Sequence, residues 1–354
     1  MAGKEARRPL TALVTGVGAP PGVSIFKALR QSSLRPRIVA TDADAVSVGL
    51  FRADVGCVLP RVTKDEPDYL AALAALCLEE RVDLVCFGSE IEMRRVAPHR
   101  RELEARTGAR LVVNDATLVE RFMDKWGMFT ALRAKGLPVP DTALGEDAAG
   151  VRVLIESRGF PLVLKPRHGS GSRDLHLVRT AGALDDLLRR VPEPVVQEYL
   201  APDDEEYTVG CYQSPHNGYL GEIIFRRSLA AGLTYKAEVV FDREISAACR
   251  TVVEAFPLFG PVNLQLRKTA QGVRVFEINL RFSSSAVMRA HFGFNEAELC
   301  LRDLVLGERV EAPAVKRGWA LRYWDEVYVE EEHCRTVRER GRIDGPVGNK
   351  AEDF

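Results

Sequence analysis

The stretch NLQLRKTAQGVRVFEINLR, residues 263–281, carries the clearest pattern in this 354-residue chain. Apolar and polar residues alternate on both sides of a turn that we expect at residues 269–272, as in a β-hairpin with one buried face. Centring the hairpin on Gln271 gives two polar cross-strand pairs, Gln265 with Glu277 and Asn263 with Asn279. One face of the hairpin is then apolar, and the other is rich in side-chain oxygens.

The oxygen-rich face of this hairpin suits a hard cation. A carboxylate beside amide oxygens is a donor set for Mg²⁺, which keeps several waters and also binds phosphate oxygens. We therefore expect a metal set of Gln265, Glu277 and Asn279. The alternative is the solvent-exposed polar face of an ordinary hairpin, which is a common feature of antiparallel sheets.

A second motif, LVLKPRHGSGS at residues 162–172, joins a strand-like run ending in Lys165 to a loop rich in glycine and serine. Backbone N–H groups of such a loop can surround a phosphate, and a lysine beside the loop adds positive charge. The motif lacks the Gly-Lys-Ser/Thr sequence of a P-loop. It predicts a phosphate lid, and a plain hairpin turn is the alternative.

Taken in order, these motifs resemble the ATP-grasp superfamily, closest to its carbamoyl-phosphate-synthase-like and amino-acid-ligase branch, over about residues 10 to 325. In NDATLVERFMDKWGMFTALRAKGLPVP, Lys125 stands at the position of the superfamily's first phosphate-binding lysine. Lys165 matches the second lysine. The flexible glycine-rich loop matches four residues, Gly169, Ser170, Gly171 and Ser172.

The resemblance also assigns the remaining ATP contacts. PVVQEYL resembles the hinge that holds adenine, which implies contacts from Gln197, Glu198, Tyr199 and Leu200. Glu206 matches the acid that takes the ribose hydroxyls, and the hairpin residues Gln265, Glu277 and Asn279 match the magnesium set. Arg281 matches a catalytic arginine of the superfamily, and the resemblance implies a catalytic role for Lys165 as well. The implied ligands are ATP and Mg²⁺ or Mn²⁺.

The order of elements predicts a mixed α/β and α+β chain. From Leu10 to Asn114, short apolar runs alternate with helical stretches, which predicts parallel strands with crossover helices. Residues 114–140 have helical periodicity, and hairpin-linked strands follow. With the resemblance, this implies a Rossmann-like pre-ATP-grasp domain followed by a two-lobed ATP-grasp fold. We expect the Rossmann-like domain at 1–113 and the ATP-grasp domain at 114–330, with its small lobe at about 140–200 and its large lobe at about 201–330. A charged C-terminal tail at 331–354 is expected to be either a mobile segment or a docking segment.

The glycine-rich turn at residues 16–22, GVGAPPG, follows the first strand, and Asp42 ends the second. Such a turn can hold a dinucleotide phosphate at a helix N-terminus. Pro20 and Pro21 interrupt the usual glycine fingerprint, so the pattern predicts a dinucleotide site only weakly.

Composition narrows the class of protein. Hydrophobic residues make up 46% and charged residues 28% of the chain, as in globular proteins. No apolar run approaches the roughly 18 residues of a membrane span. The net charge of −1 and the lack of a long basic run argue against general nucleic-acid binding. The seven cysteines have no metal or redox spacing, and with no signal-peptide pattern we expect reduced thiols in the cytoplasm.

The resemblance implies a carboxylate-amine ligase that activates a carboxylate as an acyl phosphate on Mg-ATP and passes it to an amine, with an amino acid among its substrates. Two alternatives remain open, a carbamoyl-phosphate-synthase-like enzyme acting on bicarbonate or carbamate and a noncatalytic ATP-binding regulator. Leu280 replaces the proline that usually follows the asparagine, and Ser283 to Ser285 replace an arginine-containing segment of carbamoyl phosphate synthases. A homodimer is compatible with this scheme.

Substrate contacts are expected from basic residues and serines beyond the metal set. Arginines can pair bidentately with a carboxylate. The candidates are Arg226, Arg227, Lys236, Ser284 and Arg289. Glu90 and Glu92 follow the strand DLVCFGS, at the carboxyl end where open α/β sheets place ligands, so an amine is a further candidate ligand there.

Overall fold

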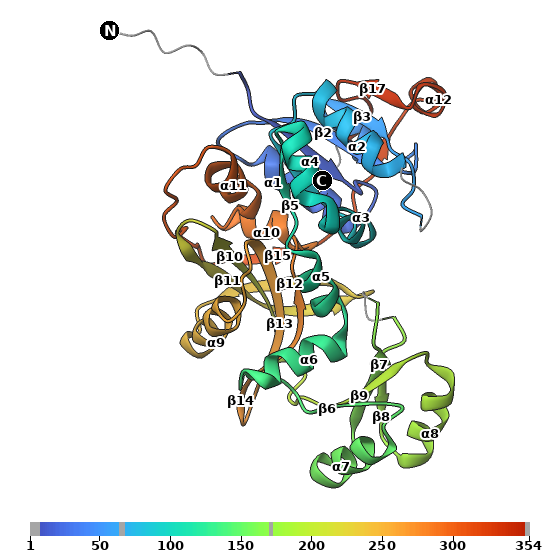
Figure 1. Ribbon diagram of the computed structural model, residues 1–354, viewed down its shortest axis with the longest axis vertical. Coiled ribbons are helices and arrows are strands. Elements are labelled where there is room, and N and C mark those ends of the chain that lie inside the picture. Colours follow the sequence, from blue (N-terminus) through green and yellow to red (C-terminus); the bar gives the residue numbers. More distant parts are fainter. Residues whose placement is uncertain (1–7, 64–67, 170–172, 351–354) are drawn as a thin grey trace.

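The computed structural model describes residues 8–63, 68–169 and 173–350, with side chains to residue 348. The three larger sheets of the described chain are stacked along the long axis of the molecule (Figure 1). The N-terminal parallel sheet lies at one end, the small four-stranded sheet lies at the other, and a large antiparallel sheet lies between them. The expected fold class, a Rossmann-like domain followed by two antiparallel sheets, is confirmed.

The N-terminal domain is built on the strand order β17-β3-β2-β1-β4-β5, parallel except for β17. Its parallel strands are β1 Thr11–Thr15, β2 Arg37–Asp42, β3 Val55–Val58, β4 Leu84–Phe87 and β5 Arg110–Val112. The helices are α1 Pro20–Arg30, α2 Asp68–Glu79, α3 Glu90–Val96 and α4 Arg100–Thr107, with short 3₁₀ turns at Leu50–Arg52 and Ala97–His99. The strands are buried on both faces, which explains their continuous apolar runs.

The glycine-rich turn after β1 serves close packing of the backbone. A Cβ at Gly22 would lie 2.1 Å from the carbonyl oxygen of Gly16, and a Cβ at Gly88 would lie 2.5 Å from Cα of Gly22. The start of α1 therefore packs directly on the ends of β1 and β4. Asp42 is engaged as well, since its carboxylate accepts from the backbone N–H of Gly18 at 2.7 Å.

Two helices, α5 Ala116–Met123 and α6 Lys125–Ala134, connect the N-terminal domain to the lobes. The periodicity over 114–140 predicts one helix, and the structure breaks it at Asp124. Asp124 has extended backbone and caps the second helix by accepting from the N–H of Trp126. Because of this break, Lys125 is the first residue of α6.

The small lobe is an antiparallel sheet with strand order β6-β9-β7-β8. Its strands are β6 Thr142–Leu144, β7 Leu162–Pro166, β8 His176–Val178 and β9 Pro194–Glu198. The helices α7 Ala148–Arg158 and α8 Ala181–Arg190 pack on it, and Leu154 and Leu184 lie in the lobe's own core with Leu164. The lobe therefore has an independent hydrophobic core.

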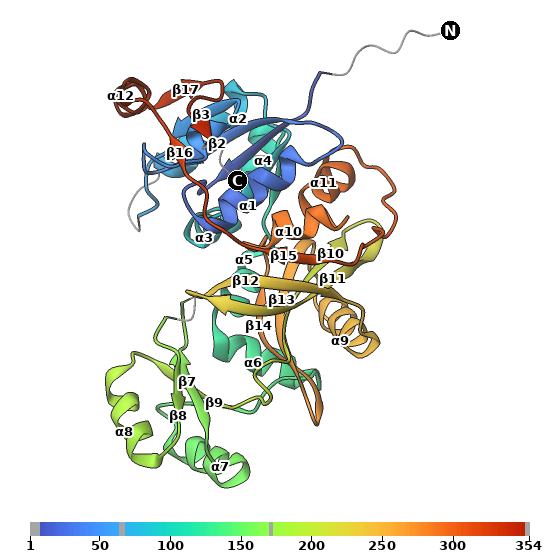
Figure 2. The same ribbon diagram turned by 180° about the vertical axis from the view of Figure 1, so that it is seen from behind.

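The large lobe is an antiparallel sheet with strand order β14-β13-β10-β11-β12-β15. The strands are β10 Glu206–Ser214, β11 Gly218–Ala230, β12 Leu233–Val240, β13 Gly260–Thr269, β14 Gly272–Asn279 and β15 Trp319–Leu321. Helix α9 Arg243–Glu254 covers one face. Helices α10 Ala286–His291 and α11 Glu296–Cys300, followed by a π-helical turn at Leu301–Val305, cover part of the other and pack against α1 (Figure 2).

The C-terminal segment returns to the N-terminal domain. Helix α12 Glu331–Arg340 is followed by β17 Arg342–Asp344, which pairs antiparallel with β3, while β16 Val327–Tyr328 pairs with β18 Asn349–Lys350. Val337 and Ile343 are buried in the core around α1. The described part of the segment expected to be a charged tail thus packs on the edge of the N-terminal sheet, where its apolar residues are buried.

Candidate functional site

The hairpin of β13 and β14 has the expected pairing. Asn263 lies opposite Asn279 and Gln265 lies opposite Glu277. The Oε1 atom of Glu277 accepts from Gln265 Nε2 at 3.0 Å and from Asn279 Nδ2 at 2.9 Å. A regular hairpin with this register would place Phe276 opposite Leu266, but a bulge after Gln265 pairs Leu266 with Val275 instead.

The two lysines of the small lobe and α6 face this hairpin. Lys165 is only 6% exposed and donates to Gln197 Oε1 at 3.0 Å. Burial lowers the pKa of Lys165 to about 8. The carboxylate of Glu277 opposes this shift, because it favours the charged form of the lysine. Burial also lowers the pKa of Lys125, again opposed by Glu277. Both ammonium groups therefore lie within electrostatic reach of one carboxylate from the opposite lobe.

The start of α6 is fixed to the strand that carries Lys165. Arg167 forms an ion pair with Asp124 at 2.6 Å, and the carbonyl of Arg167 accepts from the backbone N–H of Lys125 at 3.1 Å. Lys125 Nζ donates to the carbonyl of Gly169 at 2.8 Å. Gly169 has a φ of +117°, which favours glycine. The loop residues Ser170, Gly171 and Ser172 lie outside the described residues.

The expected adenine hinge follows β9. Gln197 links Lys165 to Thr142 through its amide, and Glu198 is held by the N–H of Asp141 at 2.9 Å and by Arg158 at 3.1 Å. These two side chains are thus engaged within the small lobe. Tyr199 and Leu200 continue the segment toward β10, and the carbonyl of Leu200 accepts from Arg267 at 2.6 Å.

Glu206 begins β10 and lies between two arginines that the sequence analysis did not connect to it. Arg227 of β11 and Arg267 of β13 each donate to it at 2.9 Å. Arg227 also donates to Gln265 Oε1 at 2.6 Å. The cross-strand register brings these side chains onto the face that carries Glu277. The oxygen of Gln265 is therefore engaged by a cation.

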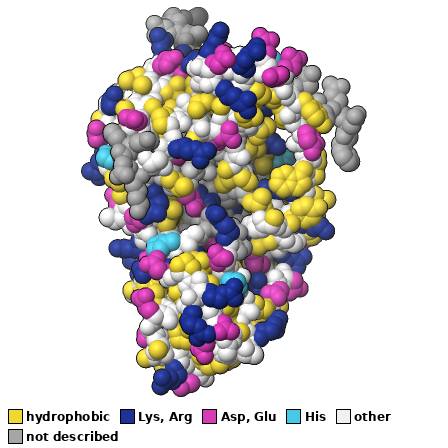
Figure 3. All heavy atoms as spheres, turned by 90° about the vertical axis from the view of Figure 1, so that its right-hand side faces the viewer, with side chains coloured by type: hydrophobic (Ala, Val, Ile, Leu, Met, Phe, Trp, Pro, Cys, Tyr) yellow, Lys and Arg dark blue, Asp and Glu magenta, His cyan; other side chains and the backbone are white. Residues whose placement is uncertain are grey.

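The basic cluster expected to bind substrate is divided between two faces. Arg226 and Arg227 are neighbours on β11, so their side chains point to opposite sides of the sheet. Arg226 pairs with Glu238 at 2.6 Å, and Lys236 shares that side. A hollow of about 590 Å³ is lined by residues of both faces, among them Arg226, Arg227 and Trp319. Figure 3 shows a hollow across the middle of the molecule with Lys and Arg side chains inside it.

Arg289 does not reach a ligand-accessible surface. Its side chain is 0% exposed and forms an ion pair with Glu296 at 2.9 Å, and it also donates to Asn263. A Cβ at Gly210 would lie 2.5 Å from the Arg289 guanidinium, so the glycine makes room for it. The expected substrate contact is therefore wrong for Arg289, which instead joins α10 to the polar face of the sheet through Asn263.

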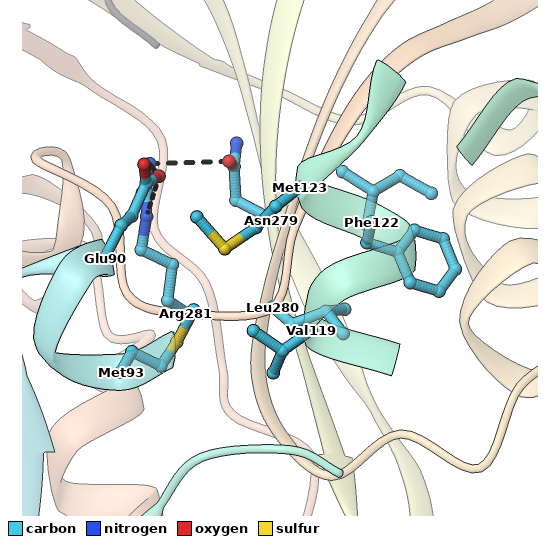
Figure 4. Close-up of a pocket in the computed structure, with 9 residues that line it drawn as sticks. Glu90, Met93, Val119, Phe122, Met123, Asn279, Leu280 and Arg281 are labelled. Carbon is cyan, nitrogen blue, oxygen red and sulfur yellow. Dashed lines mark hydrogen bonds and ion pairs between the residues drawn. The ribbon is translucent and has the colours of Figure 1, made fainter. Parts of the chain in front are cut away.

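Arg281 leaves the end of β14 and meets the N-terminal domain. Its Nε atom donates to Glu90 at 2.8 Å, and its NH2 group lies 3.4 Å from Asn279 Oδ1 (Figure 4). Met93 and Leu280 line a small pocket beside this contact. The ion pair links the carboxyl end of β4 to the hairpin, so the two domains meet at the site.

Glu92 lies behind Glu90, on the buried side of α3. Burial raises the pKa of Glu92 to about 7, while contacts with Thr15 and Tyr69 oppose the shift. Its side chain is 8% exposed. Of the two carboxylates expected at this edge of the sheet, only Glu90 faces the hairpin.

The residues around Glu277 fit one magnesium ion better than a cage of protein ligands. No cluster of three His, Cys, Asp or Glu side chains that could hold a metal occurs among the described residues. A single carboxylate with the amide of Asn279 suits an ion that takes its remaining ligands from phosphate and water.

No helix in the described part of the chain is long and apolar enough to cross a membrane.

Comparison with solved structures identifies the architecture. An ADP complex of PurK, N5-carboxyaminoimidazole ribonucleotide synthetase, superposes with a TM-score of 0.68, 16% identity and coverage of 94% of this chain and 84% of that one. The Staphylococcus aureus N5-carboxyaminoimidazole synthetase with ADP has a TM-score of 0.68 and 15% identity, with coverage of 89% of this chain and 82% of that one. The biotin carboxylase domain of Hydrogenobacter thermophilus 2-oxoglutarate carboxylase, with MgADP and bicarbonate, has a TM-score of 0.63 and 14% identity, with coverage of 87% of this chain and 73% of that one.

The chain has the ATP-grasp fold, with PurK and biotin carboxylase as structural neighbours, so the resemblance noted in the sequence is confirmed at the level of the fold. Within it, residues 190–327 match the family described as ATP-grasp in the biosynthetic pathway with Ter operon. An uncharacterized protein of Sinorhizobium fredii, y4rH, is 30% identical over 195 residues, which are 48% of this chain and 38% of that protein. The match thus spans less than two fifths of the relative's length.

Proposed function

We propose that this protein is an ATP-dependent carboxylate-amine ligase. The observation that carries the proposal is the convergence of Lys125, Lys165 and Glu277 from different elements onto one polar site. Two cations facing a carboxylate with amide neighbours match the charge pattern of a nucleotide triphosphate with a divalent ion. A polar face that only met solvent would not need a lysine buried opposite it.

In the proposed complex, ATP lies between the small-lobe sheet and the large sheet. Lys125 and Lys165 bind phosphate oxygens together with the loop that begins at Gly169. Gln197 to Leu200 contact the base, and Glu206 accepts from the ribose hydroxyls. Because Glu206 already accepts from two arginines, its orientation is fixed before the nucleotide arrives.

Glu277 and Asn279, assisted by Gln265, would hold magnesium or manganese. The ion neutralises charge on the terminal phosphates, which otherwise repel an anionic carboxylate. Asn279 can offer its oxygen to the ion because its Oδ1 has only a long 3.4 Å contact with Arg281. The side-chain oxygen of Gln265 accepts from Arg227 and is not open to the ion. Gln265 therefore contributes by orienting Glu277, to which its amide N–H donates.

The chemistry proposed for the site is acyl transfer. A carboxylate oxygen attacks the γ-phosphorus, ADP leaves, and the resulting acyl phosphate is attacked by an amine, which releases phosphate and forms an amide. Positioning and exclusion of water carry most of the rate, since the acyl phosphate hydrolyses readily. Arg281 lies beside the metal set and stabilises the developing negative charge. Glu90 orients Arg281, and Arg227, on the same face as Glu277, is a candidate for contact with substrate.

Bicarbonate is a second candidate for the activated acid. The biotin carboxylase domain to which the chain is similar was crystallised with MgADP and bicarbonate. Both candidates use the same phosphate site, and they differ in the acid that attacks the phosphate. The compound that stimulates ADP release therefore identifies the acid.

The test is ADP and phosphate release with amino acids supplied in pairs, singly, or replaced by bicarbonate, with mass spectrometry of the product. Ligase activity predicts ADP formation that depends on both a carboxylate and an amine and yields their amide. ADP release stimulated by bicarbonate alone supports the second candidate. Tight ATP binding without turnover under any of these conditions contradicts both and favours a regulator.

A further inference from the structure

Arg322 stands at the edge of the large sheet, directly after β15. Its backbone N–H donates to the carbonyl of Tyr235 at 2.8 Å, while Ala320 pairs with Ala237. Residues two apart on a strand share a face. Arg322 therefore lies on the same side as Ala320 and Ala237, which is also the side of Arg227 and Glu277.

The guanidinium of Arg322 reaches the segment that follows the metal hairpin. Its NH2 group donates to the carbonyl of Ser284 at 2.6 Å, three residues beyond Arg281. Ser283 and Ser285 in this segment are buried, whereas Ser284 is partly exposed. The guanidinium of Arg322 thus lies beside the segment by which the chain leaves the hairpin.

Arg322 differs from the other arginines of this region in its partners. Arg281, Arg227, Arg267, Arg226 and Arg289 each form an ion pair with a carboxylate. Among the described residues, Arg322 has no carboxylate partner, and burial without a compensating anion lowers its pKa. A half-buried guanidinium retains donors for an external anion after its one bond to a carbonyl.

We propose that Arg322 binds a substrate carboxylate that is not activated in the reaction. The inference rests on the proposed ligase function and specifies one of its substrates. The reacting carboxylate must lie at the phosphate, beside Glu277 on β14, whereas the guanidinium of Arg322 lies against Ser284, on the segment that follows the hairpin. One substrate therefore carries a carboxylate that survives in the product, as in an amino acid that attacks with its amine or a dicarboxylic acid.

The surroundings of Arg322 add a preference for an apolar or aromatic body on this substrate. Tyr235 and Tyr323 are 42% and 66% exposed, and Trp324 is 78% exposed. Tyr323 and Trp324 follow Arg322 in the chain, and Tyr235 lies across the edge of the sheet. Large exposed apolar groups near a guanidinium without a carboxylate partner are typical of a site that recognises a carboxylate attached to an apolar group.

The first experiment measures occupancy of Arg322 without any reaction. The full chain with magnesium and a non-hydrolysable ATP analogue is treated with phenylglyoxal, and modification of Arg322 is followed by peptide mass spectrometry. The twenty amino acids and a set of dicarboxylic acids serve as protecting probes. We expect at least one acid to slow modification of Arg322 about fivefold or more, and its carboxamide not to do so. Failure of every acid to protect overturns the proposal.

The second experiment compares Arg322→Gln with Arg309→Gln, an exposed arginine of the same lobe, in ADP release. For the protecting acid, we expect KM to rise about 100-fold in R322Q, the size of a lost charge-assisted pair, with KM for ATP unchanged. The carboxamide should bind wild type and R322Q equally. An unchanged KM for the acid in a folded R322Q protein overturns the subsite and leaves the ligase proposal standing. Protection without ADP release by wild type keeps the subsite and removes the ligase proposal.

Discussion

Glu277 and Glu206 are carboxylates on one face of the same sheet, yet their surroundings differ. Glu277 accepts from two neutral amides, Gln265 and Asn279, and its charge acts on two lysines, Lys125 of α6 and Lys165 of the small lobe. Glu206 accepts from Arg227 and Arg267, which come from neighbouring strands. The charge of Glu206 is matched within its own sheet, whereas the charge of Glu277 is directed toward the other lobe.

The difference separates two uses of a carboxylate in one site. A carboxylate surrounded by neutral donors keeps its charge available for a metal ion, while one held by two guanidinium groups serves mainly as an oriented hydrogen-bond acceptor. Substitutions of these carboxylates and of their partners test this contrast.

Replacing Glu277 with Gln should have the largest effect, because it removes the one carboxylate of the metal set. We expect substrate-dependent ADP release to fall by about 10³-fold, equivalent to about 4 kcal/mol of lost transition-state stabilisation. Steady-state ADP assays over a magnesium series measure this. The exposed Glu254→Gln is the matched control. Normal turnover of E277Q at ordinary magnesium would remove the metal assignment.

Lys165 should give ATP affinity a dependence on pH. Burial lowers its pKa to about 8 from 10.5, so in the free protein the charged form that binds phosphate is lost as pH rises through 8. Affinity should be level below pH 8 and fall about tenfold per unit above it. Since the unfolded chain binds more protons between pH 8 and 10.5, this group makes stability of the free protein rise over that range.

Nucleotide titrations from pH 6.5 to 9.5 measure the dependence, and Lys165→Met is the control that cannot titrate. K165M should bind ATP weakly and without the inflection. An inflection near pH 8 that persists in K165M would show that another group produces it.

Glu206→Gln should act on nucleotide recognition with little effect on kcat. We expect KM for ATP to rise about tenfold, in line with weakened hydrogen bonds to the ribose, and wild type to discriminate against 2′-deoxy-ATP more than E206Q does. The same exchange leaves Arg227 and Arg267 without their shared anion, so thermal unfolding should occur at lower temperature. Equal discrimination by both proteins would contradict the ribose contact.

The smallest effect is expected at Arg226, which neighbours Arg227 but points to the other face. Arg226→Gln removes an exposed ion pair with Glu238 and should change stability by less than about 1 kcal/mol, with ATP turnover within about twofold of wild type. Arg227→Gln should raise KM for ATP several-fold because it releases Glu206 and Gln265. Similar kinetics for R226Q and R227Q would show that the two faces of β11 are not functionally distinct.

The hairpin was predictable from sequence because its information is local. Alternation and a short turn fix which of Gln265, Glu277 and Asn279 share a face, and the structure has this pairing. The bulge at Phe276 was not predictable, because one extra residue leaves the apolar pattern almost unchanged.

The residues that sequence analysis missed or misplaced depend on strand order. Arg267 meets Glu206 only because β10 lies beside β13, and Arg289 is buried only because α10 folds back over Gly210. Alternation could have separated Arg226 from Arg227 without a structure. The pairing of β17 with β3 joins residues more than 280 positions apart, for which the sequence carries no local signal.

The most direct test of the central claim is a crystal structure with Mn²⁺ and a non-hydrolysable ATP analogue, with manganese located by its anomalous scattering. We predict triphosphate between Lys125 and Lys165 and a manganese peak in contact with oxygens of Glu277 and Asn279. Nucleotide bound elsewhere, for example at the glycine-rich turn 16–22, with no manganese at Glu277, would contradict it.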